Sequence, residues 1–202
     1  AATLMPAFRA RASGRDRSDV LTQCIAEEIK LVLKFLKTSV PRTLVAADTR
    51  PPLVILTDAS LEGDDKVSGL GAVLIDRVDG AKLFFAEWLA IDQLVKLQAE
   101  TQKVINGLEV LAVKVAVFTW KDRLLHRRVF VFIDNDAARA CLIKSFSQSQ
   151  SIKMATHEIV LLQASHPFFV WWSRVPSPSN IADLASRMDL MPLTANGYIR
   201  VR

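Results

Sequence analysis

The 202-residue chain is poor in cysteine and has no long uninterrupted apolar run. Its two cysteines, Cys24 and Cys141, are too few for a disulfide framework and lack metal-ligand spacing. The longest apolar stretches are interrupted, one by Lys114 and another by Pro167, so none reaches the roughly 18 residues that a membrane span requires. These absences argue against a disulfide-rich secreted protein and a membrane-spanning protein, and we expect an intracellular, reducing location.

The composition predicts a globular chain with a mildly basic surface. Half of the residues are hydrophobic, which is enough to bury a full core. The formal charge of +5 and the pI of about 9.4 are compatible with a polyanionic partner. The first twenty residues contain four arginines and no apolar core, so they are not a secretory signal. Because the chain starts with Ala1 rather than Met, we expect it to be a processed or excised piece of a longer protein.

Apolar spacing divides the chain into three parts. Residues 1–50 are expected to form an N-terminal extension with one amphipathic helix, from Val20 to about Thr38, which ends before Pro41. Residues 51–190 form the main domain, and residues 191–202 a C-terminal tail.

Within the main domain the pattern is rich in strands at first and then alternates. Strands are expected at 53–58, 68–76, 82–90, 127–134 and 168–175, and helices at 98–120, 136–145, 150–164 and from about Ile181. Asp79-Gly80 is typical of a hairpin turn, so the first three strands are predicted to form an antiparallel meander. The expected fold class is α/β: a mixed five-stranded sheet, the meander plus parallel strands, flanked by helices.

Two acids, Asp58 in "LVILTDAS" and Asp134 in "FIDND", end apolar strands in this pattern. Each one alone is explained as a turn-forming residue. If the two strands are parallel neighbours, however, both carboxylates lie at the carboxyl end of the sheet, where open α/β sheets bind ligands.

Glu109 interrupts an apolar helical stripe that contains Ala112 and Ala116. A buried ionised carboxylate costs several kcal/mol unless it is compensated, and a cation would compensate it. The alternative is a residue at the edge of the stripe that reaches solvent. Asp183 has a structural alternative of its own, because in "NIAD" it can reach back to the backbone amide of Asn180 in a helix cap.

Four carboxylates at one end of a sheet would form an all-oxygen site, which suits Mg²⁺ or Mn²⁺ rather than zinc. Two such ions can activate a water molecule and stabilise a leaving oxygen in phosphodiester hydrolysis. If they converge, Asp58, Glu109, Asp134 and Asp183 are the candidate metal ligands and catalytic residues, although spacing alone favours the capping role for Asp183.

The order of the segments "TDAS", "GLEVLA", "FIDND" and "RVPSPSNIADLASR" resembles the ribonuclease H family. It is most similar to the RNase H domain that follows reverse transcriptase in retroelements of the tyrosine-recombinase and pararetrovirus-like types. The resemblance covers about residues 50–190. It implies that the four acids chelate two Mg²⁺ ions and that the chain is an endonuclease hydrolysing the RNA strand of RNA/DNA hybrids.

The resemblance also implies substrate contacts near the acids. Ser60, Gly69 and Gly71 are expected beside the cleft, where the corresponding backbone lines the minor groove of the hybrid, although such glycines also allow close packing. Asn135 and Arg139 are expected to touch phosphate or ribose, and an ordinary polar helix start explains them equally well.

The sequence departs from the family pattern in two ways. The loop at 175–180 lacks the histidine that many cellular relatives carry, and no Lys- and Trp-rich protrusion for gripping substrate is present. The alternative function, which suits the missing initiator Met, the apolar composition and the lone domain, is a domesticated, catalytically silent RNase H-fold subunit of a large protein or ribonucleoprotein assembly. Trp171 and Trp172 must face opposite sides of a strand, so one of them, together with the N-terminal helix, is a candidate surface for a protein partner.

Overall fold

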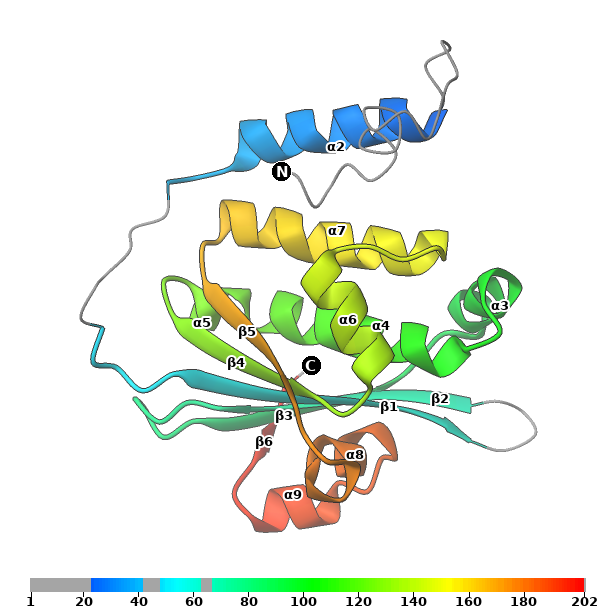
Figure 1. Ribbon diagram of the computed structural model, residues 1–202. Coiled ribbons are helices and arrows are strands. Elements are labelled where there is room, and N and C mark those ends of the chain that lie inside the picture. Colours follow the sequence, from blue (N-terminus) through cyan, green and yellow to red (C-terminus); the bar gives the residue numbers. More distant parts are fainter. Residues whose placement is uncertain (1–22, 42–47, 63–66, 202) are drawn as a thin grey trace.

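The structure, a computed structural model, describes residues 23–41, 48–62 and 67–201 of the chain (Figure 1). The strands are β1 (Leu53–Glu62), β2 (Val67–Ile75), β3 (Lys82–Trp88), β4 (Arg128–Ile133), β5 (Phe169–Arg174) and β6 (Ile199–Arg200). The helices are α2 (Gln23–Thr38), α3 (Ile91–Glu100), α4 (Val104–Thr119), α5 (Lys121–Leu124), α6 (Asp136–Lys144), α7 (Gln150–Ser165), the 3₁₀ turn η2 (Ser177–Ser179), α8 (Ala182–Ser186) and α9 (Met191–Ala195).

The strands form one mixed sheet in the order β5-β4-β1-β2-β3-β6. β1, β2 and β3 are an antiparallel meander, and β4 and β5 run parallel to β1, so the predicted α/β fold class is confirmed. The sheet has a sixth strand because residues 199–200, which we expected in a tail, pair in parallel with β3. α9 lies in the same C-terminal segment.

The single helix expected over 98–120 is instead divided into α3 and α4. The break follows α3 at Thr101, whose backbone is extended and whose hydroxyl accepts a hydrogen bond from the backbone N–H of Lys103 at 3.2 Å. A threonine side chain that bonds the backbone two residues ahead offers an alternative to the helical hydrogen bond. The periodicity of apolar residues does not register such a local turn.

Helices cover both faces of the sheet (Figure 1). The larger core lies between the sheet and α3, α4, α6 and α7, and it includes Ile55, Val131 and Val113. A smaller core joins β2 and β3 to α8 and α9 through residues such as Phe84 and Ala185. The site described below lies where α4 and α8 approach β1 from opposite faces.

α2 lies outside this body, along α7 (Figure 1). The chain that leaves α2 is fixed by a hydrogen bond from the Val40 N–H to the Ala164 carbonyl at 2.9 Å. Leu33 and Leu36 remain exposed on the helix. In the part of the chain that the structure describes, no helix is both long and apolar enough to cross a membrane.

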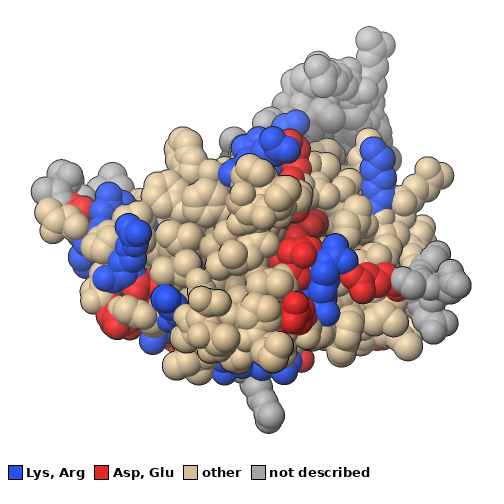
Figure 2. Space-filling view, turned by 90° about the horizontal axis from the view of Figure 1, so that it is seen from below, with Lys and Arg blue, Asp and Glu red and all other residues tan. Residues whose placement is uncertain are grey.

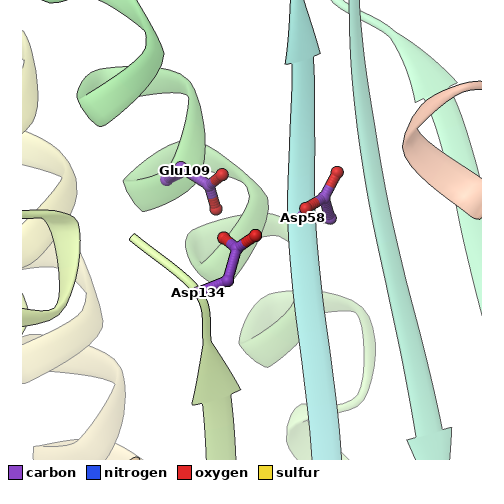
Figure 3. Close-up of side chains that lie close together, drawn as sticks. All are labelled: Asp58, Glu109 and Asp134. Carbon is purple, nitrogen blue, oxygen red and sulfur yellow. The ribbon is translucent and has the colours of Figure 1, made fainter. Parts of the chain in front are cut away.

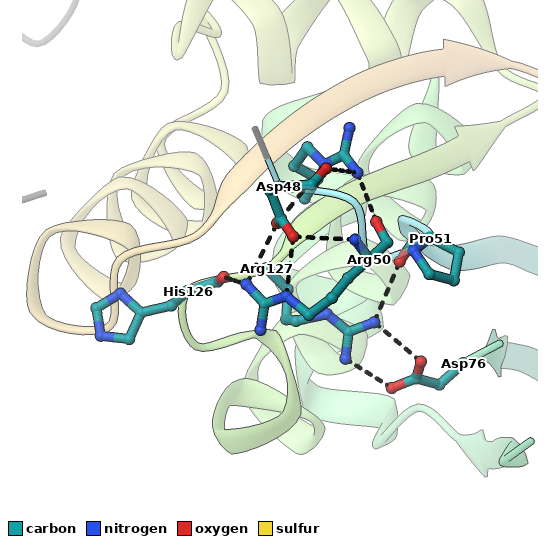
Figure 4. A network of polar contacts seen from close by, with 7 residues as sticks. Asp48, Arg50, Pro51, Asp76, His126 and Arg127 are labelled. Carbon is teal, nitrogen blue, oxygen red and sulfur yellow. Dashed lines mark hydrogen bonds and ion pairs between the residues drawn. The ribbon is translucent and has the colours of Figure 1, made fainter. Parts of the chain in front are cut away.

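A buried ion pair joins two strands at the end of the sheet where β1 begins, because Ile75, next to Asp76, pairs with Val54. Figure 4 shows the contacts of this pair. Arg127, just before β4, donates to both carboxylate oxygens of Asp76, just after β2, at 2.9 Å each, and also to the carbonyl of Pro51 at 3.3 Å. This guanidinium holds the pKa of Asp76 below its usual range. Because Arg127 is satisfied by the fold, it does not contribute to a basic surface for nucleic acid.

Gly69 and Gly71 on β2 allow α8 to pack directly on the sheet. A Cβ at Gly71 would overlap the backbone nitrogen of Ser186, and one at Gly69 would overlap the Ser186 carbonyl. Both glycines are buried beneath α8. They therefore serve close packing, and the expected exposure of their backbone to a substrate groove is wrong.

Gly71→Ala is expected to destabilise the protein by about 2 kcal/mol or more, because the new methyl group meets backbone that cannot rotate away. Gly107→Ala in α4 is the matched control, since the three atoms nearest to its Cβ belong to the Leu97 side chain, whose end can shift as backbone cannot, and alanine favours the helix. Urea unfolding of both variants measures the difference. Equal stability of the two would contradict the packing explanation.

Candidate metal centre

Asp58, Glu109 and Asp134 come from three separate elements and converge (Figure 3). One carboxylate oxygen from each lies within 4.8 Å of the others. Asp58 is on β1, Glu109 is on α4, and Asp134 directly follows β4. The sheet explains the approach of the two aspartates, because β1 and β4 are adjacent and parallel, with Leu56 opposite Phe132. The structure thus brings together three of the four predicted acids.

Asp58 does not end its strand as the sequence suggested. β1 continues to Glu62, and Asp58 pairs with Gly71 of β2 in the antiparallel register. Only the parallel pairing with β4 ends before Asp58, at Leu56. The backbone of Asp58 is therefore fixed within β1 by its pairing with β2. On the side of β4 no strand pairs with it, which leaves room for Asp134.

The carboxylate of Asp58 is fixed by the segment around α8. Asn180 donates its amide hydrogens to Asp58 Oδ1 at 3.1 Å and to the Thr57 carbonyl at 3.0 Å. The Ser186 hydroxyl donates to Asp58 Oδ2 at 2.5 Å. All of these polar groups are buried. Sequence reasoning assigned Asn180 to helix capping and missed Ser186, although both belong to the "SNIADLASR" segment that carried the resemblance.

Glu109 is buried against the core, as its place in an apolar stripe predicted. Its side chain is 3% exposed, and Ala112 and Ala116 on the same helix are fully buried. Its Oε2 atom has no hydrogen-bond partner in the structure. A buried carboxylate oxygen without a partner costs free energy, and a bound cation would remove that cost.

Burial and mutual repulsion raise the pKa of two of the acids. Desolvation is the main cause of the rise in the pKa of Asp58 to about 7, and the charges of Asp134 and Asp183 add to it against the Ser186 hydrogen bond. Desolvation likewise raises the pKa of Glu109 to about 9, with further contributions from Asp58 and Asp134. Acids whose pKa values are raised by burial and by each other's charge cluster at functional sites, and a bound cation would favour their ionised forms.

Asp183 lines the same pocket but lies outside the close group of three acids. Its Oδ1 accepts a hydrogen bond from Arg187 Nε at 2.8 Å, and the other side of the Arg187 guanidinium is ion-paired with Glu62. Asp183 does not act as the predicted capping acid, because the backbone N–H of Asn180 donates to the Ser177 carbonyl. Arg187 was missed in the sequence, although a spacing of four residues on a helix is the expected signature of such a pair.

The three predicted substrate-binding residues lie in different surroundings. Ser60 lines the pocket but is buried, and its hydroxyl donates to the Ser186 carbonyl at 2.8 Å. Asn135 accepts hydrogen bonds from the start of α6 and donates to Asn106 of α4 at 2.9 Å. Arg139 is paired with Asp136 and faces a separate hollow beside β5.

The pocket containing the acids is open and has a volume of about 540 Å³. Seen from below, acidic side chains gather around a basic one on this side of the molecule (Figure 2). The carboxylate oxygens that line the pocket are ligands of the kind that Mg²⁺ and Mn²⁺ prefer. Together with the unpartnered Oε2 of Glu109, this donor set fits a divalent cation held by Asp58, Glu109 and Asp134.

Comparison with solved structures identifies the fold. A structure of LC11-RNase H1 in complex with an RNA/DNA hybrid is similar with a TM-score of 0.53 and 16% identity, over 67% of this chain and 94% of that one. A second structure of LC11-RNase H1, isolated from compost by a metagenomic approach, gives a TM-score of 0.52 and 18% identity, over 69% and 98% of the two chains. No family model matches the sequence, and no curated protein is detectably similar to it. The chain has an RNase H-like fold.

Glu109→Gln is expected to stabilise the metal-free protein at pH 8. The pKa of Glu109 is higher in the folded state, about 9, than in the unfolded chain, near 4.5. The free energy of unfolding therefore decreases as the pH rises between these two values. Removing the charge should therefore add roughly 1–3 kcal/mol at pH 8 and much less at pH 5. Urea unfolding in EDTA at both pH values measures this.

Glu27→Gln, at an exposed position on α2, is the matched control and should change stability little. Addition of Mg²⁺ at pH 8 should stabilise the unmodified protein more than Glu109→Gln, since the variant lacks one ligand. A variant that is less stable than the parent at pH 8 in EDTA would show that Glu109 is not an uncompensated buried charge.

Proposed function

We propose that this chain is a divalent-metal-dependent endonuclease that hydrolyses the RNA strand of RNA/DNA hybrids. The observation that carries the proposal is the convergence of Asp58, Glu109 and Asp134 in an open pocket, with a buried carboxylate oxygen left unpartnered. The similar LC11-RNase H1 was solved with an RNA/DNA hybrid, which supports this substrate. A fold alone does not fix a function, and the proposal therefore rests on the site.

Asp58, Glu109 and Asp134 would hold the metal, and Asp183 at the rim of the pocket is the proposed fourth ligand for a pair of ions. Two divalent ions supply Lewis-acid activation of water and stabilisation of the leaving oxygen in phosphodiester hydrolysis. The products expected from the resemblance are a 3′-hydroxyl and a 5′-phosphate.

The surrounding residues position these acids. Asn180 and Ser186 direct both oxygens of Asp58, so this carboxylate cannot rotate without breaking two hydrogen bonds. Asn135 links the start of α6 to α4 and so fixes the backbone beside Asp134 relative to the helix of Glu109. Rigid placement of ligands is what a catalytic metal site requires.

The predicted substrate contacts are revised by their surroundings. Asn135, at the pocket, is the proposed contact to the RNA strand. Ser60 acts through Ser186, since its hydroxyl is buried and already donates there. Arg139 would reach a phosphate only outside the pocket, on the surface that it shares with Trp171 and Arg174.

The proposal includes an origin in a retroelement polyprotein, and the order of the four sequence motifs is its support. It also includes a protein partner. Trp172 packs against the core, whereas Trp171 is 68% exposed on the outer strand β5. A large exposed aromatic side chain on an edge strand favours a contact with another molecule.

Asp134→Asn is expected to lower cleavage of a labelled RNA/DNA hybrid by about 10³-fold or more in Mg²⁺, because it removes a charge that the metal requires. Circular dichroism should show an unchanged fold. Asp122→Asn, an exposed position on α5, should cleave like the parent, and EDTA should stop cleavage by both. Duplex DNA and duplex RNA, tested alongside, define the substrate.

Unchanged cleavage by Asp134→Asn would refute the assignment of the site. A parent protein that folds, binds no Mn²⁺ and cleaves nothing would instead favour the second function, a silent RNase H-fold subunit of a larger assembly. The exposed Trp171 is the observation that favours this alternative.

A further inference from the structure

Arg187 is the only basic residue among the described residues that line the acidic pocket. Its guanidinium bridges two carboxylates from different elements, Asp183 of α8 and Glu62 at the end of β1. Arg187 also acts on the group of three acids, because its positive charge opposes the rise in the pKa of Asp58. The Arg187 guanidinium is therefore held at the rim of the pocket, in an ion pair with Asp183, the proposed fourth metal ligand.

The contacts of Arg187 do not suit it to bind a phosphate group. Two carboxylates already share its single positive charge, so the three side chains together are negatively charged. A phosphate would be repelled by Asp183 and Glu62 and would have to break two ion pairs. A divalent cation, in contrast, would be attracted by the same carboxylates once the guanidinium turns away.

The geometry allows this movement without a change in the fold. The side chains of Arg187, Asp183 and Glu62 are each about half exposed, so the ion pairs can exchange with solvent. Ser186, next to Arg187, is fixed through its hydrogen bond to Asp58, and the α8 backbone packs on Gly69 and Gly71. The Arg187 side chain can therefore turn away without a shift of the α8 backbone.

We propose that Arg187 is a built-in counter-ion that occupies Asp183 and thereby weakens binding of the second divalent cation. The inference rests on the proposed function, because it assumes that the pocket takes metal. Arg187 is a positioning residue in this scheme: it sets how readily Asp183 joins Asp58, Glu109 and Asp134. The first ion, held by the buried group of three, depends on it less.

The test is calorimetric titration of the metal-free 202-residue chain with MnCl₂ at pH 7.5 and constant ionic strength. In Arg187→Gln the dissociation constant of the more weakly bound Mn²⁺ ion is expected to fall about tenfold, because a nearby positive charge is removed and Asp183 is freed. Arg174→Gln is the matched control, since Arg174 is ion-paired with Asp136 outside the pocket and should leave the constant unchanged.

Arg187→Lys provides a second variant that keeps the charge but cannot bridge two carboxylates in the same way. In Arg187→Lys the dissociation constant of the more weakly bound Mn²⁺ ion should lie between the values for the parent and Arg187→Gln. The counter-ion role is overturned if this dissociation constant is unchanged or larger in Arg187→Gln. Should Arg187→Gln not fold, the same result in Arg187→Lys overturns it.

The two proposals fail in different ways. A parent chain that binds Mn²⁺ and cleaves the hybrid, with Arg187→Gln indistinguishable from Arg174→Gln, contradicts only the counter-ion role. A parent chain that neither binds Mn²⁺ nor cleaves contradicts the proposed function, and the counter-ion role falls with it. Weaker binding of the uncleaved hybrid by Arg187→Gln in Ca²⁺, with no change in Mn²⁺ affinity, would identify Arg187 as a phosphate contact and overturn the inference.

Discussion

Two buried carboxylates, Asp58 and Glu109, lie in one pocket, and the charge of Asp58 contributes to the raised pKa of Glu109. In the absence of a cation this arrangement opposes folding, since burial disfavours the ionised form of each group. The packing around the pocket must hold it together. α4 packs against the sheet through small, fully buried residues and so holds Glu109 in place, while Asn180, just before α8, and Ser186 of α8 donate hydrogen bonds to Asp58.

The RNase H-like topology is what makes this convergence possible. Parallel pairing of β1 and β4 brings Asp58 and Asp134 together where this pairing ends, and β1 then continues paired with β2 alone. The continuation carries Ser60 and Glu62, both of which contact the α8 segment. The middle of this one long strand thus contributes Asp58 to the candidate metal centre, and its end contacts the C-terminal segment.

The sequence predicted the parts of this site that depend on apolar patterning. Asp134 after a buried strand and Glu109 within an apolar stripe both show in the pattern, and the structure places them together. The side-chain contacts of α8 could not be predicted in the same way. Whether Asp183 joins the other acids or pairs with Arg187 depends on local rotamers and competing charges, and β6 is too short at two residues to give a periodic signal.

The two ends of the sheet use charge in opposite ways. Arg127 and Asp76 form a closed pair in which each buried charge has its partner, and such a pair fixes β2 and β4 without offering a site for a ligand. At the other end the buried acids outnumber the nearby cations, and Arg187, the one basic residue among the described lining of the pocket, is held at the rim and half exposed. Asp76 thus has a cationic partner within the protein. The group of Asp58, Glu109 and Asp134 would gain one by binding a cation from solution. This asymmetry, rather than the number of acids, distinguishes the candidate metal centre from the ion pairs around it.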